Sequence, residues 1–192
     1  MNKENPETFH PENEQEWRTW LEENHLEKQS VWLIYYKKST GKKSLAWSEA
    51  VDQALCFGWI DSTARPIDEH TYMQFFTKRK PKSPWSKINK EKVASLLAED
   101  LIAEAGHKII ELAKQNGAWS FLDEVEELIV PQDLFDAFEL HTGSKEFFEG
   151  LSKSVRKMML HWVVSAKQDV TRQKRIHEIA EKAGLGMRPK NF

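Results

Sequence analysis

The sequence predicts an α+β fold, with a small antiparallel-rich sheet packed by helices in the N-terminal half and an all-helical C-terminal half. Runs of β-branched and aromatic residues, typical of strands, stand at 31–36, 59–66 and 71–79. Apolar residues at helical spacing precede these runs and lie between them. Beyond residue 98 the spacing is helical throughout. We therefore expect a sheet of about three strands with helices on one face.

The 192 residues allow one domain of above-average size or two small ones. The change near residue 100 from mixed to helical patterning is the one candidate boundary, and no flexible linker marks it. We expect an α+β subdomain over 1–98 and a helical subdomain over 99–192, packed together in one compact body.

The first elements follow from capping and spacing. The first ten or so residues are polar and are expected to be a frayed tail. Asn13 and Glu16 have the spacing of a helix N-cap and its reciprocal acid, which predicts a helix near 14–24. A second helix near 48–57 should end at Gly58, with this glycine at positive φ.

The strands at 59–66 and 71–79 are close enough in sequence to form an antiparallel ribbon. Prolines 81 and 84 then interrupt regular structure, and Ser86 is placed to cap a helix near 87–98. We expect that helix to turn four apolar side chains inward. They are Ile88, Val93, Leu96 and Leu97.

Composition excludes several classes of protein. No apolar run approaches the roughly 20 residues that span a bilayer, and the N-terminus has no apolar segment typical of a secretory signal. Cys56 is the only cysteine, which excludes an internal disulfide and a cysteine-built zinc site. We expect a cytoplasmic protein without a metal or cofactor.

Charge is distributed in blocks, although the net charge is only -2. Residues 76–92 hold seven bases and one acid, and residues 153–192 hold ten bases and three acids. Residues 99–136 hold ten acids and two bases. The blocks either complement one another and face solvent, or form a basic surface for an anionic partner.

Motifs of known chemistry are missing from the sequence. The seven histidines form no i, i+4 pair, and Gly41-Lys42 lacks the first glycine of a phosphate-binding loop. Cys56 lies near a helix C-terminus, where the macrodipole disfavours a thiolate, so we expect a buried, unreactive thiol. Glu49, Asp52 and Asp61 could serve in acid–base chemistry, or could be ordinary solvated carboxylates.

The densest group of chemically useful side chains lies at 72–92, where bases alternate with aromatic residues. Arginine and lysine bind phosphate or carboxylate, and tryptophan offers a stacking face. The alternative is that Trp85 is a core anchor and the lysines are solubility charges. The candidate ligand-binding residues are Asp61, Tyr72, Arg79, Trp85, Ser86 and Asn89.

Three segments resemble the YdeI/OmpD-associated (bacteriocin-protection) family. They are ALCFGWIDS at 54–62, FTKRKPKSPWSKIN at 76–89 and WVVSAKQDVTRQKRI at 162–176. The resemblance extends over nearly the whole chain, with Ser62 in place of a usual glycine and Lys78 in place of a usual proline. It implies a link to bacteriocin or cationic-peptide stress but no catalytic residue. Arg172 and Arg175 are expected to pair with the acidic 99–136 stretch.

Three functions follow from these patterns. The first is a binding or accessory protein with an anion site in a pocket between the sheet and the 87–98 helix, whose partner is a small anionic ligand or a protein. The second is an enzyme on a small anionic substrate, with Asp61 or Glu49 as base and Arg79 as anion clamp. The third, a nucleic-acid binder using 78–92 and the basic C-terminus, ranks last because the chain has no net basic charge.

Overall fold

The computed structural model describes residues 7–190 and 192, and it divides the chain into two compact units. The first unit runs to Ser120 and the second begins at Phe121. The division falls later than the boundary expected between residues 98 and 99. The reason is that helix α4 (Glu104–Gln115) packs on α2 (Trp47–Cys56) and so belongs to the first unit.

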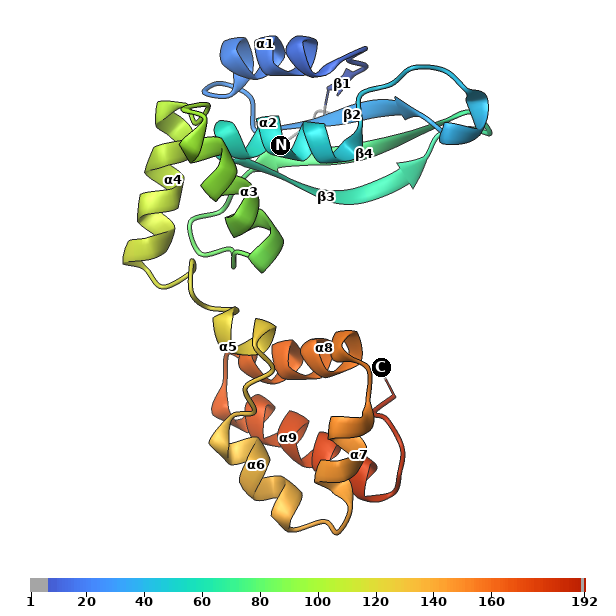
Figure 1. Cartoon of the computed structure of the whole chain (residues 1–192), viewed down its shortest axis with the longest axis vertical. Helices are drawn as coiled ribbons and strands as arrows, with labels where there is room; N and C mark the ends of the chain where they lie inside the picture. The colour runs from blue at the N-terminus through green and yellow to red at the C-terminus, as the bar shows by residue number, and fades with distance from the viewer. Residues whose placement is uncertain (1–6, 191) are drawn as a thin grey trace, which may run out of the picture. The chain divides into compact units, whose positions relative to one another are not determined.

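The first unit holds a mixed four-stranded sheet in the order β1-β2-β4-β3 (Figure 1). Strands β2 (Ser30–Tyr36), β4 (Thr71–Lys78) and β3 (Trp59–Pro66) are antiparallel, as the sequence predicts. The additional strand, β1 (Thr8–Phe9), runs parallel to β2. It corrects the expectation of a frayed tail at these two residues, because Phe9 packs on the rings of Trp17 and Trp20. The rest of that expectation, at residues 1–6, lies outside the described residues.

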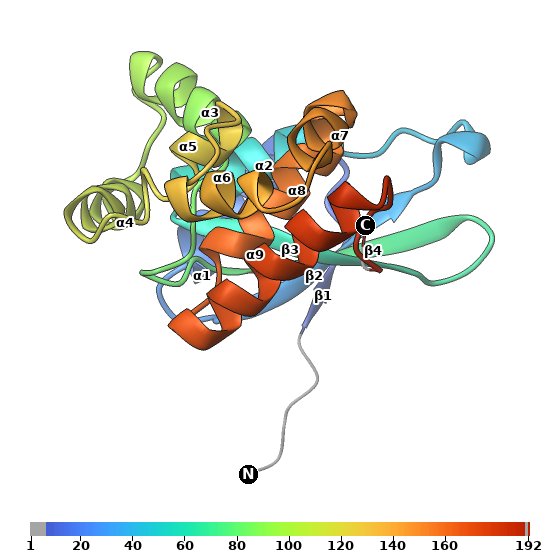
Figure 2. The ribbon, with the colours of Figure 1, turned by 90° about the horizontal axis from the view of Figure 1, so that it is seen from below.

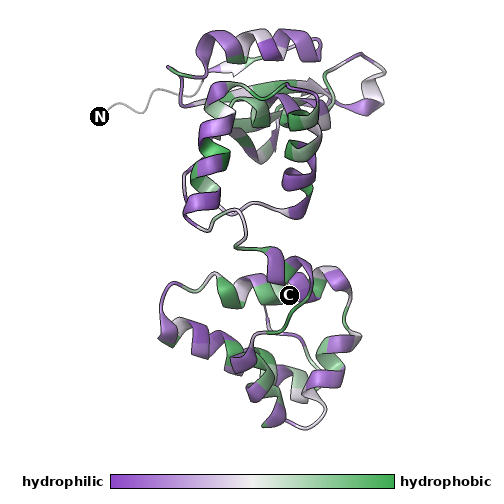
Figure 3. Cartoon of the chain, turned by 60° about the vertical axis from the view of Figure 1, so that its left-hand side comes forward, coloured by the Kyte–Doolittle hydropathy of each residue, from purple (hydrophilic) through white to green (hydrophobic). Residues whose placement is uncertain are grey.

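One face of the sheet is covered by α1 (Glu14–Asn24) and α2, so the α+β fold class is confirmed. Alternate residues of β2 are buried, and Phe76 of β4 lies on the same face. Trp17 of α1 reaches Phe76 edge-on, with 5.5 Å between ring centroids. Figure 3 shows the apolar residues of the helices gathered toward the interior of each unit.

Local sequence signals place the helix ends where they were expected. Asn13 accepts a hydrogen bond from the backbone N–H of Glu16 at the start of α1. Gly58 follows α2 with φ of +73°, a conformation that side chains other than glycine rarely adopt. The chain then enters β3. The β3–β4 turn and the 37–46 loop, which includes η1 (Lys38–Thr40), extend from the same end of the sheet (Figure 2).

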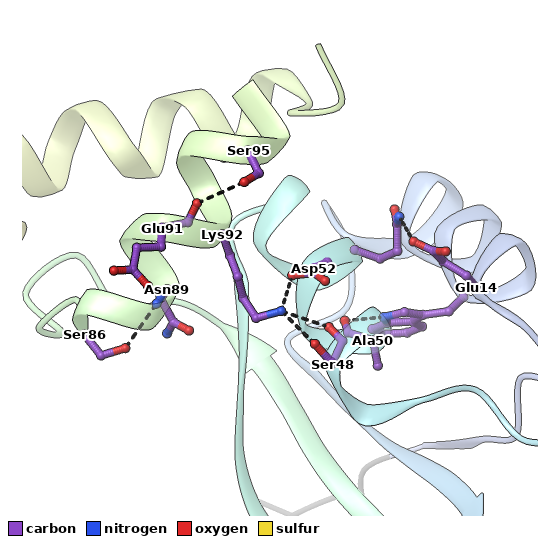
Figure 4. A network of polar contacts seen from close by, with 11 residues as sticks. Glu14, Ser48, Ala50, Asp52, Ser86, Asn89, Glu91, Lys92 and Ser95 are labelled. Carbon is purple, nitrogen blue, oxygen red and sulfur yellow. Dashed lines mark hydrogen bonds and ion pairs between the residues drawn. The ribbon is translucent and has the colours of Figure 1, made fainter. Parts of the chain in front are cut away.

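Helix α3 (Lys87–Ala98) is capped by Ser86, whose Oγ accepts from the backbone N–H of Asn89 at 3.3 Å. Lys92 ties α3 to α2 by contacting Asp52 at 2.6 Å and Ser48 Oγ at 2.9 Å (Figure 4). Val93 and Leu96 are buried as expected. Ile88 and Leu97 are not, with 64% and 40% of their surface exposed, because α3 packs along one narrow face only.

The second unit is entirely helical. Its helices are α5 (Asp123–Glu126), α6 (Gln132–Glu139), α7 (Ser144–Gly150), α8 (Lys153–Val164) and α9 (Asp169–Gly184). Helix α9 packs on α6, α7 and α8 around a core that includes Leu134 and Leu160. Arg172 forms the expected ion pair with Asp133, through contacts of 2.6 and 2.9 Å. Arg175 instead donates to the carbonyl oxygen of Trp162.

Within residues 7–190 and 192, no helix is both long and apolar enough to cross a membrane.

Candidate anion-binding site

Arg79 follows β4 directly and is 6% exposed. Its backbone N–H donates to the carbonyl oxygen of Gly58 at 2.9 Å, which holds the end of β4 beside the start of β3. The guanidinium lies over the ring of Trp85, with 3.7 Å between Cζ and the ring centroid. This stacking is a cation–π contact, and it fixes the plane of the charged group.

The Arg79 guanidinium makes few hydrogen bonds for its degree of burial. Nη2 donates to the carbonyl oxygen of Pro84 at 2.5 Å. Nε and Nη1 are buried and, among the residues that the structure describes, have no hydrogen-bond partner. We call these two nitrogens the Arg79 donors. Burial lowers the pKa of Arg79 to about 10, against the attraction of the Asp61 carboxylate, which raises it.

The segment 80–85 carries a second donor of the same kind. Ser83 donates its backbone N–H to the carbonyl oxygen of Lys80, and its Oγ is buried with no partner in the described part of the chain. Trp85 is 1% exposed and packs on Trp119, with 5.0 Å between ring centroids. The side-chain amide of Asn116 donates to the carbonyl oxygen of Pro81 at 2.9 Å. These contacts anchor the segment to the end of α4.

Ser86 and Asn89 are engaged in the N-terminal cap of α3. Ser86 follows Trp85 directly in the chain, so the cap fixes where α3 begins after Trp85. Their roles here are structural ones that the capping pattern already predicts.

Asp61 and Tyr72 belong to a different cluster, on the covered face of the sheet. Asp61 Oδ2 accepts from Trp47 Nε1 and from Gln74 Nε2, each at 3.0 Å. Tyr72 stacks on Tyr35 at 5.0 Å between centroids. Burial, reinforced by Tyr72 and Asp61, raises the pKa of the Tyr35 hydroxyl well above its usual range.

The Asp61 carboxylate therefore acts on Arg79 through longer-range attraction. In the described chain no ion pair or hydrogen bond joins the two side chains. Glu49, the other candidate base, accepts from the backbone N–H of Ala46 at 3.0 Å and caps α2. Cys56 is fully buried, and burial raises the pKa of its thiol to about 11. No group of His, Cys, Asp and Glu side chains suited to a metal ion occurs among residues 7–190 and 192.

A pocket of about 300 Å³ opens beside Arg79 in the first unit. Its walls come from the turn after α1, the α2–β3 junction, the end of β4 and one side of α4. The lining residues are His25, Leu26, Phe57, Gly58, Trp59, Lys78, Arg79, Ala105, Lys108, Ile109 and Leu112. Of the six predicted ligand-binding residues, this pocket includes Arg79. Its helical wall is α4, and none of its described lining residues comes from the 87–98 helix, where the sequence had placed the pocket.

Sequence reasoning missed the contribution of α4, which is separated from Arg79 by more than 25 positions in the chain. The available signal was Gly106, a glycine inside a helical pattern. Such a glycine often marks a close approach of two backbones. Here it allows α4 to lie against the carbonyl of Cys56.

Two family models match separate parts of the chain, and each part lies within one of the two units of the structure. Residues 9–109 match the model of a domain of unknown function, DUF8412. Residues 127–186 match the family described as bacteriocin-protection, YdeI or OmpD-associated. The family resemblance is thus confirmed over 127–186, whereas the motifs at 54–62 and 76–89 fall within the other match. No curated protein and no solved structure matches the chain.

Proposed function

The chain belongs to the DUF8412 family, and its residues 127–186 match the family described as bacteriocin-protection, YdeI or OmpD-associated; from there we propose that it is a binding protein for a small oxyanion. The ligand group is a phosphate, sulfate or carboxylate, and Arg79 is its main contact. Trp85 holds the guanidinium in place, and Ser86 and Asn89 support Trp85 through the α3 cap.

The observation that carries this proposal is the pair of Arg79 donors. Leaving the hydrogen-bonding groups of a buried cation without acceptors costs several kcal/mol of folding free energy in general. A planar guanidinium matches an oxyanion with two parallel hydrogen bonds, and the parallel pair that includes Nε is completed by Nη2, which here donates to the Pro84 carbonyl oxygen. An oxyanion on this edge of the guanidinium would supply the acceptor that Nε lacks.

Access to the donors requires a movement, which is part of the proposal. The donors are buried, whereas Lys80, Pro81, Lys82 and Pro84 are exposed around them. We propose that the exposed 80–84 segment shifts when the anion enters. The hydrogen bonds between Arg79 and the bound anion then replace the lost hydrogen bond between Nη2 and the Pro84 carbonyl oxygen.

The enzyme alternative is not favoured by any observation at the site. Glu49 caps α2, and Asp61 Oδ2 already accepts two hydrogen bonds on the covered face of the sheet. Neither carboxylate lines the pocket beside Arg79 in the described chain. We therefore propose that the protein binds its ligand without transferring a proton. Asp61 and Tyr72 have a structural role and stabilise the sheet.

The family description suggests a cellular context. We propose that the protein acts in the cytoplasm as an accessory factor in protection against bacteriocins. A strain lacking the protein should then be more sensitive to a bacteriocin than its parent. Complementation with the wild type should restore survival, and complementation with Arg79→Lys should not. Equal survival of all strains would contradict this role.

Binding itself is tested by the melting temperature in phosphate, sulfate or acetate, with chloride at equal ionic strength as the reference. At ten times its Kd a ligand stabilises the folded state by about 1.4 kcal/mol. That corresponds to a rise of roughly 3–6 °C for a protein of this size. Arg79→Lys keeps the charge but loses the planar fork, so it should lose most of the rise.

Arg65→Lys is the matched control, because Arg65 also lies over a tryptophan ring, that of Trp32, at 5.0 Å. It does not line the pocket in the described structure, so its anion response should equal that of the wild type. If no oxyanion raises the melting temperature of the wild type above the chloride reference, the proposed function is wrong.

A further inference from the structure

The pocket beside Arg79 combines an apolar wall with a basic one. Phe57 and Trp59 from the α2–β3 junction face Ala105, Ile109 and Leu112 of α4. A volume of about 300 Å³ stands at the lower end of the range for small-molecule sites. The pocket is therefore suited to a short chain or a single ring rather than to a long lipid.

Packing fixes the apolar wall in place. The backbone N–H of Ala103 donates to the carbonyl oxygen of Cys56 at 2.9 Å, just before α4 begins. Gly106 lies against the same carbonyl, where any side chain would collide. Trp59, at the opposite side, is fully buried and contacts Trp20 edge-on. The wall is rigid, so it can select a ligand by shape.

The polar side of the pocket carries only basic groups among its described lining residues: His25, Lys78, Arg79 and Lys108. Lys78 Nζ donates to the carbonyl oxygen of Leu26 at 2.7 Å, a contact that leaves its charge uncompensated. Lys108 contacts Glu104 at 2.6 Å, but both side chains are more than 70% exposed, and such pairs contribute little. The mouth of the pocket thus attracts an anion.

From this juxtaposition we infer that the pocket binds a short amphipathic carboxylate, with its apolar part between Trp59 and α4 and its carboxylate toward Arg79 and Lys108. The inference rests on the proposed function and narrows its ligand class. It follows from the apolar wall and the basic side chains of the pocket together with Arg79 in its lining, and the carboxylate reaches the buried Arg79 donors once the 80–84 segment has shifted.

Calorimetric titration of the full chain with butyrate, hexanoate and octanoate tests the inference. Each buried methylene contributes a roughly constant free energy, so affinity should rise about fourfold per methylene until the pocket is filled. Hexylamine has the same chain with a positive head group and should not bind. An affinity that does not change with chain length would overturn the inference.

Two lysines of α4 provide matched charge variants. Lys108 and Lys114 are both paired with an acid on their own helix, at 2.6 and 2.7 Å, but Lys108 lines the pocket and Lys114 is absent from its described lining. Lys108→Glu should weaken hexanoate binding by roughly threefold or more, and Lys114→Glu should leave it nearly unchanged. Equal effects of the two variants would contradict the inference.

Two variants that each add an aromatic ring to α4 test whether the pocket itself holds the ligand. Ala105→Phe places a ring in the pocket and should abolish hexanoate binding, whereas His107→Phe places a ring on an exposed part of the same helix and should not. Failure of this inference is distinguishable from failure of the proposed function. Phosphate binding that depends on Arg79, without chain-length dependence, contradicts only the inference. Binding that depends on chain length but has the same affinity in Arg79→Lys as in the wild type contradicts the proposed function.

Discussion

Gly106 of α4 lies against the carbonyl oxygen of Cys56, so closely that a Cβ on Gly106 would be 2.3 Å from that oxygen. Carbon and oxygen do not approach so closely without bonding, and the obstacle is backbone rather than a flexible side chain. The contact sets the distance between α4 and the end of α2, and with it the width of the pocket beside Arg79.

Gly106→Ala should therefore destabilise the protein by roughly 1–3 kcal/mol, although alanine is the better helix former. Urea unfolding measures this change. Gly150→Ala is the control, since no described atom lies within 4 Å of the Cβ it would add, within a helix. This control should be neutral or slightly stabilising. If Gly106→Ala were as stable as the wild type, the close packing of α4 would be refuted.

At Gly58, too, the backbone conformation and the neighbouring atoms disfavour a side chain. Its φ is +73°, and a Cβ there would lie 3.0 Å from Ile109 Cγ2 and 3.1 Å from the carbonyl oxygen of Ala105. Gly58→Val should cost roughly 1–3 kcal/mol or more in the free energy of unfolding. Gly41→Val, with φ of +66° but no described atom within 4 Å, should cost less because only backbone strain remains.

Cys56 should be unreactive in the folded protein. The side chain is fully buried, and burial raises the pKa of the thiol from its ordinary 9.0 to about 11. A thiol reagent should label it slowly in buffer and rapidly in urea, because the reactive thiolate is scarce and shielded. Rapid labelling of the native protein would contradict the structure at this point.

The same shift in the pKa of Cys56 makes stability depend on pH. The folded state holds the thiol proton more tightly than the unfolded state, so this contribution is complete well below pH 9 and falls as the pH rises toward 11. Unfolding free energies between pH 8 and 9.5 should decline more steeply for the wild type than for Cys56→Ala. Identical slopes would show that the thiol does not contribute.

The Arg172–Asp133 pair should stabilise the second unit modestly. The hydrogen bond from Arg172 lowers the pKa of Asp133, so its contribution is present at neutral pH and is lost as the pH falls below the ordinary range of an aspartate. Since the side chains are 27% and 32% exposed, a double-mutant cycle of Arg172→Ala and Asp133→Ala should give no more than about 1 kcal/mol. The coupling should shrink further in 1 M salt.

Direct binding to nucleic acid should be weak. Of the seven bases in 76–92, Arg79 is buried, Lys78 is bonded to the Leu26 carbonyl and Lys92 is paired with Asp52. A labelled single-stranded DNA should show no submicromolar affinity at physiological salt by fluorescence anisotropy. Tight binding that disappears in a Lys78→Ala, Lys80→Ala double variant would overturn this expectation.

Sequence alone determined the features that depend on a few neighbouring residues. Ser86 caps α3 and Gly58 ends α2 at positive φ, because capping and left-handed turns are decided within one helical turn. The strand at 31–36 and the antiparallel ribbon follow in the same way from residue type and short connections, whereas the sequence predicted a continuously buried strand where burial in β2 alternates. For the Arg172–Asp133 pair, the sequence predicted only that Arg172 would pair with the acidic 99–136 stretch, without identifying Asp133.

Tertiary structure decided what depends on residues far apart in the chain. Phe9 joins the sheet because Trp17 and Trp20 offer it a surface, and Ile88 stays exposed because α3 is packed along one narrow face. The pocket exists because Gly106 brings α4 to the end of α2, beside Arg79. Whether a buried arginine finds acceptors is likewise settled by packing geometry, since hydrogen bonds depend on distances of a few tenths of an ångström that no residue pattern records.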